Sequence, residues 1–273
     1  MASLIEVNTK FQNIKIDPSN RNSGDVILFC DDAWQLDTAV EFKYHESLIT
    51  IPMAASPAIV KVLICGGGDG MALREVLKFP EVHQATLVEI DPGMISLFRD
   101  DARWSKFNNN SMKNPRAKVV TQDALAYARE TPDLYDLIVL DFPSPSGSNS
   151  EKNYPNLYSP ASLEVFLKKL KPSGVLSMQV SMPYIFLAAT AQHLLSKGFY
   201  LWNYDTYYNT RNADSFMIAS KQNLTQQRAL PTCRFANPER IKAAFSKATQ
   251  VEQVSIDYFR LFCHGEDVEY EYS

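Results

Sequence analysis

The chain has 273 residues, of which 45% are hydrophobic and 21% are charged. This is the composition of a globular protein with a sizeable core, and it excludes a disordered or fibrous chain. A formal net charge of -4 gives no basic footprint for nucleic acid or for an anionic membrane surface. The sequence has no basic start followed by an apolar run, and no stretch approaches about 18 apolar residues. We therefore expect a cytoplasmic protein that binds neither nucleic acid nor membrane.

The cysteines are scattered along the chain, at Cys30, Cys65, Cys233 and Cys263. They lack the short paired spacing that is typical of a zinc site or a redox dithiol. The histidines show no metal-ligand spacing either. We expect reduced thiols and no bound metal.

The beginning of the chain is predicted to form a small antiparallel β-unit followed by a helix. Two short apolar segments, at 11–16 and 26–30, are separated by a stretch rich in turn-forming residues. Residues 41–54 then carry apolar side chains at helical spacing. Residues 1–56 are therefore assigned to an N-terminal β-unit and a linker helix.

Strands and helices alternate in residues 57–222, which are predicted to form a cofactor-binding catalytic domain. Apolar strands alternating with amphipathic helices predict an α/β fold, a mainly parallel Rossmann-like sheet with helices on both faces. Residues 223–273 are expected to be a C-terminal extension with a short helix near 238–247. The expected strands are 60–65, 85–91, 118–121, 134–141 and 174–180, with paired late strands at 199–208 and 215–220. The expected helices are 71–79, 92–98, 123–129, 160–170 and 183–197.

Two polar stretches are predicted to be mobile loops, at 108–115 and 143–156. The second follows the strand that ends at Asp141. It therefore lies at the edge where open parallel sheets bind their ligands. This position makes 143–156 a candidate lid.

A glycine-rich turn, CGGGDG at 65–70, follows the first parallel strand. Glycines such as Gly66 and Gly68 let the backbone turn tightly and let a ligand lie against it. Glu89 ends the next strand, where a carboxylate can accept hydrogen bonds from both hydroxyls of a ribose. Asp69 disfavours a pyrophosphate in the turn, because like charges about 4 Å apart cost on the order of 4 kcal/mol at an effective dielectric of about 20. The pattern favours a nucleoside that carries a sulfonium or ammonium group over NAD.

Carboxylates follow two further strands. Asp123 comes after the third strand, where it could accept a hydrogen bond from an adenine amino group, and Asp141 ends the fourth. Each could instead cap the helix that follows it, a common role of Asp. Taken together with Asp69 and Glu89, they match a ligand with a diol, an exocyclic amine and positive charge.

Several segments resemble the spermidine synthase (polyamine aminopropyltransferase) family, namely GGGDGMALREVLKFPEVHQATLVEID, QDA and LYDLIVLDFPSP. Upstream, QLDTAVEFKYHE at 35–46 matches the family's Gln…Glu-Phe-x-Tyr-His-Glu stretch, and KFQNI at 10–14 resembles its entry strand. The likeness covers about residues 10–220. It implies aminopropyl transfer from decarboxylated S-adenosylmethionine to a small-molecule amine, and it implies a homodimer.

The resemblance assigns one set of residues to the co-substrate. Gln12 and Glu89 would hold the nucleoside. Asp123 and Ala124 would hold the adenine. The full set that it implies for this ligand is Gln12, Gly66, Gly68, Asp69, Glu89, Asp123 and Ala124.

A second set faces the acceptor amine. Asp141 would be the catalytic residue, because an amine with a pKa of about 10.4 arrives protonated and must lose a proton before it attacks. His45, together with Asp69, would face the amine-bearing chain. The acceptor site that the resemblance implies contains Gln35, Tyr44, His45, Ser144 and Tyr207.

Ser144 departs from the family, which carries a second Asp there to grip an amine of the acceptor. A hydroxyl supplies no charge, and losing a charge-assisted hydrogen bond forfeits about 1.5–3 kcal/mol. We therefore expect an altered acceptor, an amine other than putrescine. Glu151 could replace the missing charge if its loop folds inward.

Two alternatives keep the nucleoside site but change the activity. One is methyl or aminocarboxypropyl transfer from intact S-adenosylmethionine, which Asp69 disfavours because it would lie near the carboxylate of that molecule. The other is a nucleoside-binding module without catalysis, which the presence of Asp141 disfavours.

Overall fold

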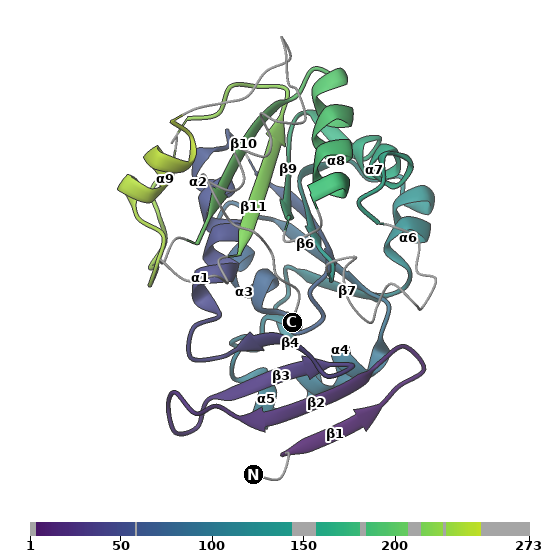
Figure 1. Cartoon of the computed structure of the whole chain (residues 1–273), viewed down its shortest axis with the longest axis vertical. Helices are drawn as coiled ribbons and strands as arrows, with labels where there is room; N and C mark the ends of the chain where they lie inside the picture. Colours follow the sequence, from purple (N-terminus) through teal and green to yellow (C-terminus); the bar gives the residue numbers. More distant parts are fainter. Residues whose placement is uncertain are drawn as a thin grey trace.

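The computed structural model describes residues 4–57, 59–143, 157–180, 184–206, 214–225 and 228–246. These residues form a four-stranded sheet and a seven-stranded sheet (Figure 1). Among the helices of these ranges, none combines the length and the apolar character that crossing a membrane requires.

The four-stranded sheet is an antiparallel meander at one end of the molecule, which confirms the predicted N-terminal β-unit (Figure 1). Its inner strands alternate buried and half-buried side chains, with Ile14, Ile16 and Leu28 in the core. The outer strands were not predicted as strands, because they are short and largely polar. The four strands are β1 (Ile5–Asn8), β2 (Asn13–Pro18), β3 (Val26–Cys30) and β4 (Ala33–Asp37).

The linker helix that was predicted at 41–54 is present as three consecutive helical segments. They are α1 (Phe42–His45), η1 (Glu46–Thr50), which has the wider turn of a π-helix, and α2 (Ile51–Ala55). Widened turns of this kind are frequent at functional sites. Here the widened turn directly follows Tyr44 and His45.

The seven-stranded sheet confirms the mainly parallel α/β fold. Its order is β10-β11-β9-β8-β5-β6-β7, and the pairs among β5 to β9 are parallel. Strand β11 is the exception, because it pairs antiparallel with β9 on one side and with β10 on the other. The strands are β5 (Lys61–Gly66), β6 (Gln84–Glu89), β7 (Ala117–Thr121), β8 (Tyr135–Asp141), β9 (Leu170–Gln179), β10 (Tyr200–Asp205) and β11 (Ser215–Ser220).

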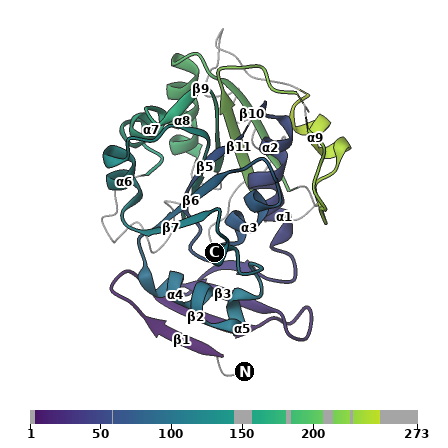
Figure 2. The ribbon, with the colours of Figure 1, turned by 180° about the vertical axis from the view of Figure 1, so that it is seen from behind.

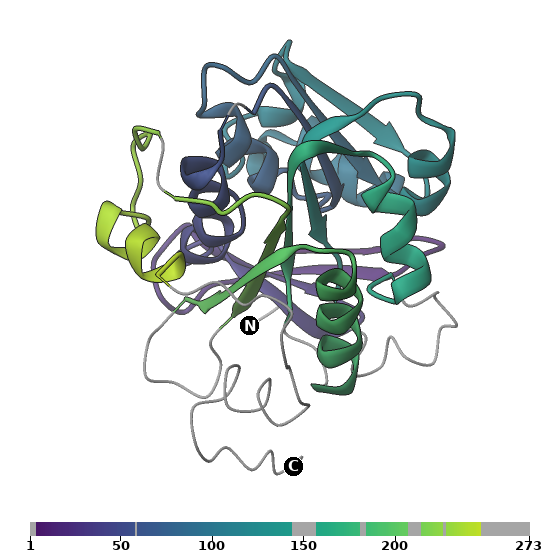
Figure 3. The same ribbon diagram turned by 90° about the horizontal axis from the view of Figure 1, so that it is seen from above.

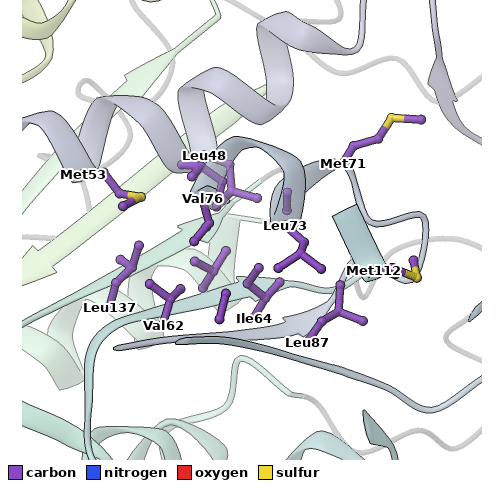
Figure 4. Close-up of a cluster of buried hydrophobic side chains, with 14 of the residues drawn as sticks. Leu48, Met53, Val62, Ile64, Met71, Leu73, Val76, Leu87, Met112 and Leu137 are labelled. Carbon is purple, nitrogen blue, oxygen red and sulfur yellow. The ribbon is translucent and has the colours of Figure 1, made fainter. Parts of the chain in front are cut away.

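Helices cover both faces of this sheet (Figures 2 and 3). On one face, side chains of η1, α2 and α3 pack on Val62 and Ile64 of β5 in a core that also includes Ile14 of the N-terminal sheet (Figure 4). On the other face, α6, α7 and α8 pack on Leu63 and Leu140. The helices of the described residues after α2 are α3 (Met71–Leu77), α4 (Pro92–Asp100), α5 (Ala102–Ser105), η2 (Ser111–Lys113), α6 (Ala124–Glu130), α7 (Pro160–Leu167), α8 (Tyr184–Ser196) and α9 (Pro238–Ala244).

The prediction of a mobile loop at 108–115 is wrong. Asn108 and Ser111 are buried, and their side chains bind the backbone of the glycine-rich turn. Asn108 Nδ2 donates to the carbonyl oxygen of Asp69 at 2.7 Å, and Ser111 Oγ donates to that of Gly70 at 2.7 Å. The polar side chains of this segment form hydrogen bonds with buried backbone carbonyl groups, and so they stabilise the glycine-rich turn.

The other predicted loop begins with Pro143, and its residues 144–156 lie outside the described residues. The C-terminal helix that was predicted near 238–247 is α9. It packs on α2 through Ile241, Ile51 and Ala54. The domain boundaries at 56 and 222 stay predictions.

Candidate active site

The candidate site lies at the carboxyl edge of the seven-stranded sheet, where β5, β6 and β8 end side by side. Gly66 at the end of β5 is in register with Asp141 at the end of β8. On the other side of β5, Cys65 pairs with Val88, which precedes Glu89 at the end of β6. The glycine-rich turn is therefore flanked by two of the predicted carboxylates, at the edge where open parallel sheets bind ligands.

The turn needs glycine because both carboxylate residues pack against it. Gly66 has a φ of +83°, and a Cβ there would overlap the carbonyl oxygen of Asp141. At Gly68, a Cβ would lie 2.7 Å from Glu89 Cγ and 2.9 Å from Glu89 Oε2. Replacing either glycine would push the backbone and the carboxylates apart.

Asp141 is held by a tyrosine from the linker helix. Tyr44 Oη donates to Asp141 Oδ1 at 2.6 Å. Burial raises the pKa of Asp141 to about 6, and the charge of Asp69 raises it as well, while His45 and the Tyr44 hydrogen bond act in the opposite direction. Burial, together with the Asp141 charge, raises the pKa of Tyr44 well above its ordinary value, so Tyr44 remains a donor. Asp141 is thus poised to exchange a proton near neutral pH.

His45 is a buried cation at the site. Its Nδ1 lies 2.7 Å from Glu41 Oε2, and its Nε2 lies 3.9 Å from Asp69 Oδ1. Burial alone would lower the pKa of His45, but the hydrogen bond and charge of Glu41, with the charges of Asp69 and Asp141, raise it to about 9. Glu41 is fixed in turn by Arg74, which donates to both carboxylate oxygens at 3.0 and 2.9 Å. Glu41 and Arg74 therefore fix the His45 ring from the side away from the glycine-rich turn.

Gln12 reaches the end of β6 through a third carboxylate. Its Nε2 donates to Asp91 Oδ2 at 2.9 Å, and the backbone N–H of Asp91 donates to Glu89 Oε1 at 2.9 Å. Burial raises the pKa of Glu89 to about 7, and the charges of Asp91 and Asp69 add to the rise. A half-buried carboxylate of this kind is suited to accept hydrogen bonds from a pair of vicinal hydroxyls.

Asp123 caps a helix, as its alternative interpretation suggested. Its Oδ1 accepts from the backbone N–H of Ala126 at 2.8 Å at the start of α6. Asp69 makes a similar local bond, since its Oδ1 accepts from the N–H of Met71 at 2.7 Å. Both carboxylates are thereby oriented by their own backbone, and the buried Ala124 follows Asp123 directly.

A comparison with known families decides what this arrangement is. Residues 41–223 match the model of the spermine/spermidine synthase domain. This chain belongs to that family. The matched residues include the YHE stretch, the glycine-rich turn and all strands of the seven-stranded sheet, so the family resemblance expected from the sequence is confirmed.

Curated members of the spermidine synthase family are similar over most of this chain but are longer than it. A polyamine aminopropyltransferase of Leptospira interrogans is 27% identical over 262 residues, which are 94% of this chain and 51% of that protein. Polyamine aminopropyltransferase 1 of Streptomyces coelicolor is 39% identical over 178 residues, 64% of this chain and 32% of that protein. The chain thus spans about half the length of the curated relatives it matches, or less.

A solved structure of the family has the same fold. It is a crystal structure of spermidine synthase in complex with the transition state analogue AdoDATO, with a TM-score of 0.74 and 26% sequence identity. The similarity covers 90% of this chain and 85% of that chain.

The spermidine synthase resemblance placed Gln35, Ser144 and Tyr207 at the acceptor. No contact between any of them and Asp141 is seen among the described residues. Ser144 and Tyr207 lie outside the described residues, as does Glu151. Gln35 lies on β4, and its amide donates locally to the carbonyl oxygen of Ala33 at 3.2 Å. Their roles stay predictions.

The structure adds residues that the sequence did not single out. Glu41 and Arg74 lie within the matched motifs, so the spacing of Glu41 four residues before His45 could have indicated the pair. Asp91 links Gln12 to Glu89. Asp214 has no local sequence signal at all, yet burial raises its pKa to about 6 and the His45 charge acts on it.

The described part of the chain contains no group of three or more His, Cys, Asp or Glu residues arranged to hold a metal ion. Cys30, Cys65 and Cys233 are free thiols, and burial raises the pKa of Cys30 to about 12. Cys263 lies outside the described residues.

Proposed function

We propose that this chain transfers an aminopropyl group from decarboxylated S-adenosylmethionine to a small-molecule amine. The observation that carries the proposal is the arrangement of Asp69, Glu89 and Asp141 around one glycine-rich turn, with Tyr44 fixing Asp141. Three half-buried carboxylates at one edge of the sheet favour a ligand with more than one positive charge. The decarboxylated donor has both a sulfonium and an ammonium group, and its acceptor brings further amines.

The residues present fit the parts of this donor. Glu89, held by the Asp91 N–H beside Gln12, would accept the ribose hydroxyls. Asp123 and Ala124 would border the adenine. Gly66 and Gly68 would let the nucleoside lie on the backbone, and Asp69 would face the cationic chain. The solved structure whose fold this chain shares is of spermidine synthase in complex with AdoDATO, which supports a donor of this class.

In the proposed reaction the neutral amine attacks the carbon beside the sulfonium. A C–N bond forms as the C–S bond breaks, and the electron pair of the C–S bond stays on sulfur, so that methylthioadenosine leaves. Asp141 takes the proton that the acceptor ammonium, with a pKa of about 10.4, must lose. Its own pKa of about 6 leaves it ionised at neutral pH and able to accept that proton. Base catalysis of this kind contributes about 100- to 10,000-fold in rate.

The acceptor and the oligomeric state are inferred from the resemblance, and the cytoplasmic location is inferred from the composition of the sequence. Ser144 removes one acidic group that the family uses, which favours an acceptor other than putrescine. A homodimer is the assembly that the family resemblance implies. The chain spans about half of its curated relatives or less, so these inferences concern the matched part.

Calorimetric titration with decarboxylated S-adenosylmethionine, intact S-adenosylmethionine and methylthioadenosine tests the proposal. We expect the decarboxylated donor to bind at least about tenfold more tightly than the intact one, because Asp69 repels the extra carboxylate. Asp69→Asn should reduce this preference, while Asp100→Asn, which removes an exposed charge on α4, should keep it. Preference for intact S-adenosylmethionine would indicate methyl or aminocarboxypropyl transfer, and binding without turnover would indicate an inactive module.

A further inference from the structure

No role was predicted for the C-terminal extension, whose described residues 228–246 lie beside the linker helix (Figures 1 and 2). At the start of the linker helix, the guanidinium of Arg234 lies 3.7 Å from the centre of the Phe42 ring. At its end, the backbone N–H of Arg228 donates to the carbonyl oxygen of Ala54 at 3.1 Å. The extension therefore holds the linker helix at both ends.

Between these contacts, a buried carboxylate binds the linker helix to the extension. The Glu46 side chain is fully buried, and its Oε1 accepts from the backbone N–H of Arg234 at 2.8 Å. Its Oε2 accepts from the backbone N–H groups of Phe235 and Ala236, both at 2.8 Å. Lys78 Nζ lies 3.9 Å from Glu46 Oε1. Moving this carboxylate would be costly, because a buried charge and buried N–H groups would lose their partners.

Glu46 is also the first residue of the widened turn η1 and directly follows Tyr44 and His45. The backbone N–H of Ile51 donates to the carbonyl oxygen of Glu46, whereas in an α-helix it would donate to that of Ser47. With 3.6 residues per helical turn, the extra residue rotates the segment before the turn by about 100° relative to the segment after it. The segment after the turn is buried in the core, so the widened turn sets the direction in which the segment before it points.

That direction brings two side chains of α1 to the candidate active site. Tyr44 Oη donates to Asp141 Oδ1 at 2.6 Å, and His45 Nε2 lies 3.9 Å from Asp69 Oδ1. Both contacts join the linker helix to the carboxyl edge of the seven-stranded sheet. A rotation of α1 by about 100° would break both of them.

We propose that Glu46 is a positioning residue for Asp141: by binding the backbone of the C-terminal extension it holds the widened turn, and the widened turn directs Tyr44 to Asp141. Glu46 acts on Asp141 only through Tyr44. The inference rests on the proposed function for the role of Asp141 as the base. The positioning itself is a property of the protein without its substrates, and it can be measured there.

The titration of the Asp141 carboxyl group, followed by NMR in the full chain without substrates, tests the inference. We expect Glu46→Gln to raise the pKa of Asp141 above its wild-type value of about 6, by at least about half as much as Tyr44→Phe does, because the Tyr44 hydrogen bond holds that pKa down. Removing the negative charge of Glu46 would by itself lower the pKa of Asp141, so a rise reports the lost hydrogen bond. In the double variant, Glu46→Gln should add nothing to the effect of Tyr44→Phe.

Asp136→Asn is the matched control, because Asp136 is also a buried carboxylate that binds backbone N–H groups. It lies near the start of β8, at the other end of the strand from Asp141, and its Oδ2 accepts from Val60 and Lys61 at 3.1 and 2.8 Å. Asp136→Asn should lower the melting temperature, as Glu46→Gln does, but should not raise the pKa of Asp141. Where the melts show that Glu46→Gln does not fold, Glu46→Asp, which keeps the charge on a shorter side chain, is the informative variant and should raise the pKa of Asp141.

An unchanged or lowered pKa of Asp141 in the folded Glu46 variant would overturn the inference. An equal rise in Asp136→Asn, or effects of Glu46→Gln and Tyr44→Phe that simply add, would overturn it as well. Formation of methylthioadenosine from the decarboxylated donor is measured separately. The expected rise without any turnover in the wild type would contradict the proposed function alone, whereas turnover with an Asp141 titration that is insensitive to Glu46→Gln would contradict this inference alone.

Discussion

Tyr44 and Asp141 are 97 residues apart in the chain and are joined by a hydrogen bond of 2.6 Å. The bond connects the linker helix to the end of a central strand. It uses one carboxylate oxygen of Asp141 and so fixes the direction in which the other can accept a proton. In the proposed reaction, Tyr44 is therefore a positioning residue for the base.

Tyr44→Phe is expected to lower kcat about tenfold to a hundredfold, because a hydrogen bond to a charged group contributes about 1.5–3 kcal/mol. The hydrogen bond from Tyr44 also holds the pKa of Asp141 down, so its loss should move the acid limb of the pH–rate profile above about 6. Tyr204→Phe is the matched control, since the Tyr204 hydroxyl donates at 2.6 Å to the carbonyl oxygen of Ser47 instead. A profile that shifts equally in both variants would contradict the role of Tyr44.

Asp141→Asn is expected to reduce activity by about 100- to 10,000-fold while stabilising the fold at neutral pH. The pKa of Asp141 rises from 3.8 to about 6 on folding, so the native state loses stability as the pH rises from about 4 to about 6, and the penalty is complete above that range. The neutral amide avoids the penalty and can still accept from Tyr44. Thermal melts should show the variant more stable by about 1–3 kcal/mol at pH 8 and little changed at pH 4. A variant that is less stable than the wild type at pH 8 would mark Asp141 as a structural residue.

Glu41→Gln is expected to lower the pKa of His45 from its wild-type value of about 9, because burial is then opposed only by the charges of Asp69 and Asp141 and no longer by the hydrogen bond and charge of Glu41. The NMR titration of the His45 ring protons measures this directly. In the wild type, the raised pKa contributes stability that is complete below about 6.5 and is lost as the pH rises through about 9. Glu164→Gln, which removes the partner of His193 at 2.9 Å, should leave the His45 titration unchanged. An unchanged pKa of His45 in Glu41→Gln would show that Glu41 does not stabilise the charged form of His45.

Gly66→Ala and Gly24→Ala separate steric overlap from backbone strain. Both glycines have positive φ, of +83° and +89°, but a Cβ at Gly24 would meet nothing within 4 Å, whereas one at Gly66 would overlap the Asp141 carbonyl. Gly24→Ala should cost only the strain of the left-handed conformation, about 1–2 kcal/mol. Gly66→Ala should lower the free energy of unfolding, measured in urea, by at least about 2 kcal/mol more than Gly24→Ala does. It should also abolish nucleoside binding. Similar costs for the two variants would show that the turn can move away from β8.

The sequence was sufficient to predict the parts of the site that follow from local order along the chain. Glu89 and Asp141 end apolar strands, and Gly66 and Gly68 follow one, so the rule for open parallel sheets places them together. Tyr44 and His45 required the family resemblance, because a histidine on a helix is more often structural.

The remaining residues depend on interactions that no local pattern encodes. Glu46 binds backbone N–H groups that lie 188 to 190 residues later in the chain, and that contact is a tertiary property. Asn108 and Ser111 belong to a polar stretch whose composition is typical of a mobile loop. Their role became visible only once their side chains were seen to bind the buried backbone of the glycine-rich turn.

The most direct test of the central claim is product analysis after incubating the protein with decarboxylated S-adenosylmethionine and, in turn, each of a panel of small-molecule amines that includes 1,4-diaminobutane. With at least one of these amines the wild type should form methylthioadenosine and an equal amount of aminopropylated amine, and Asp141→Asn should form neither at a comparable rate. Wild-type protein that releases no methylthioadenosine from the decarboxylated donor with any amine, or that instead consumes intact S-adenosylmethionine, would contradict aminopropyl transfer.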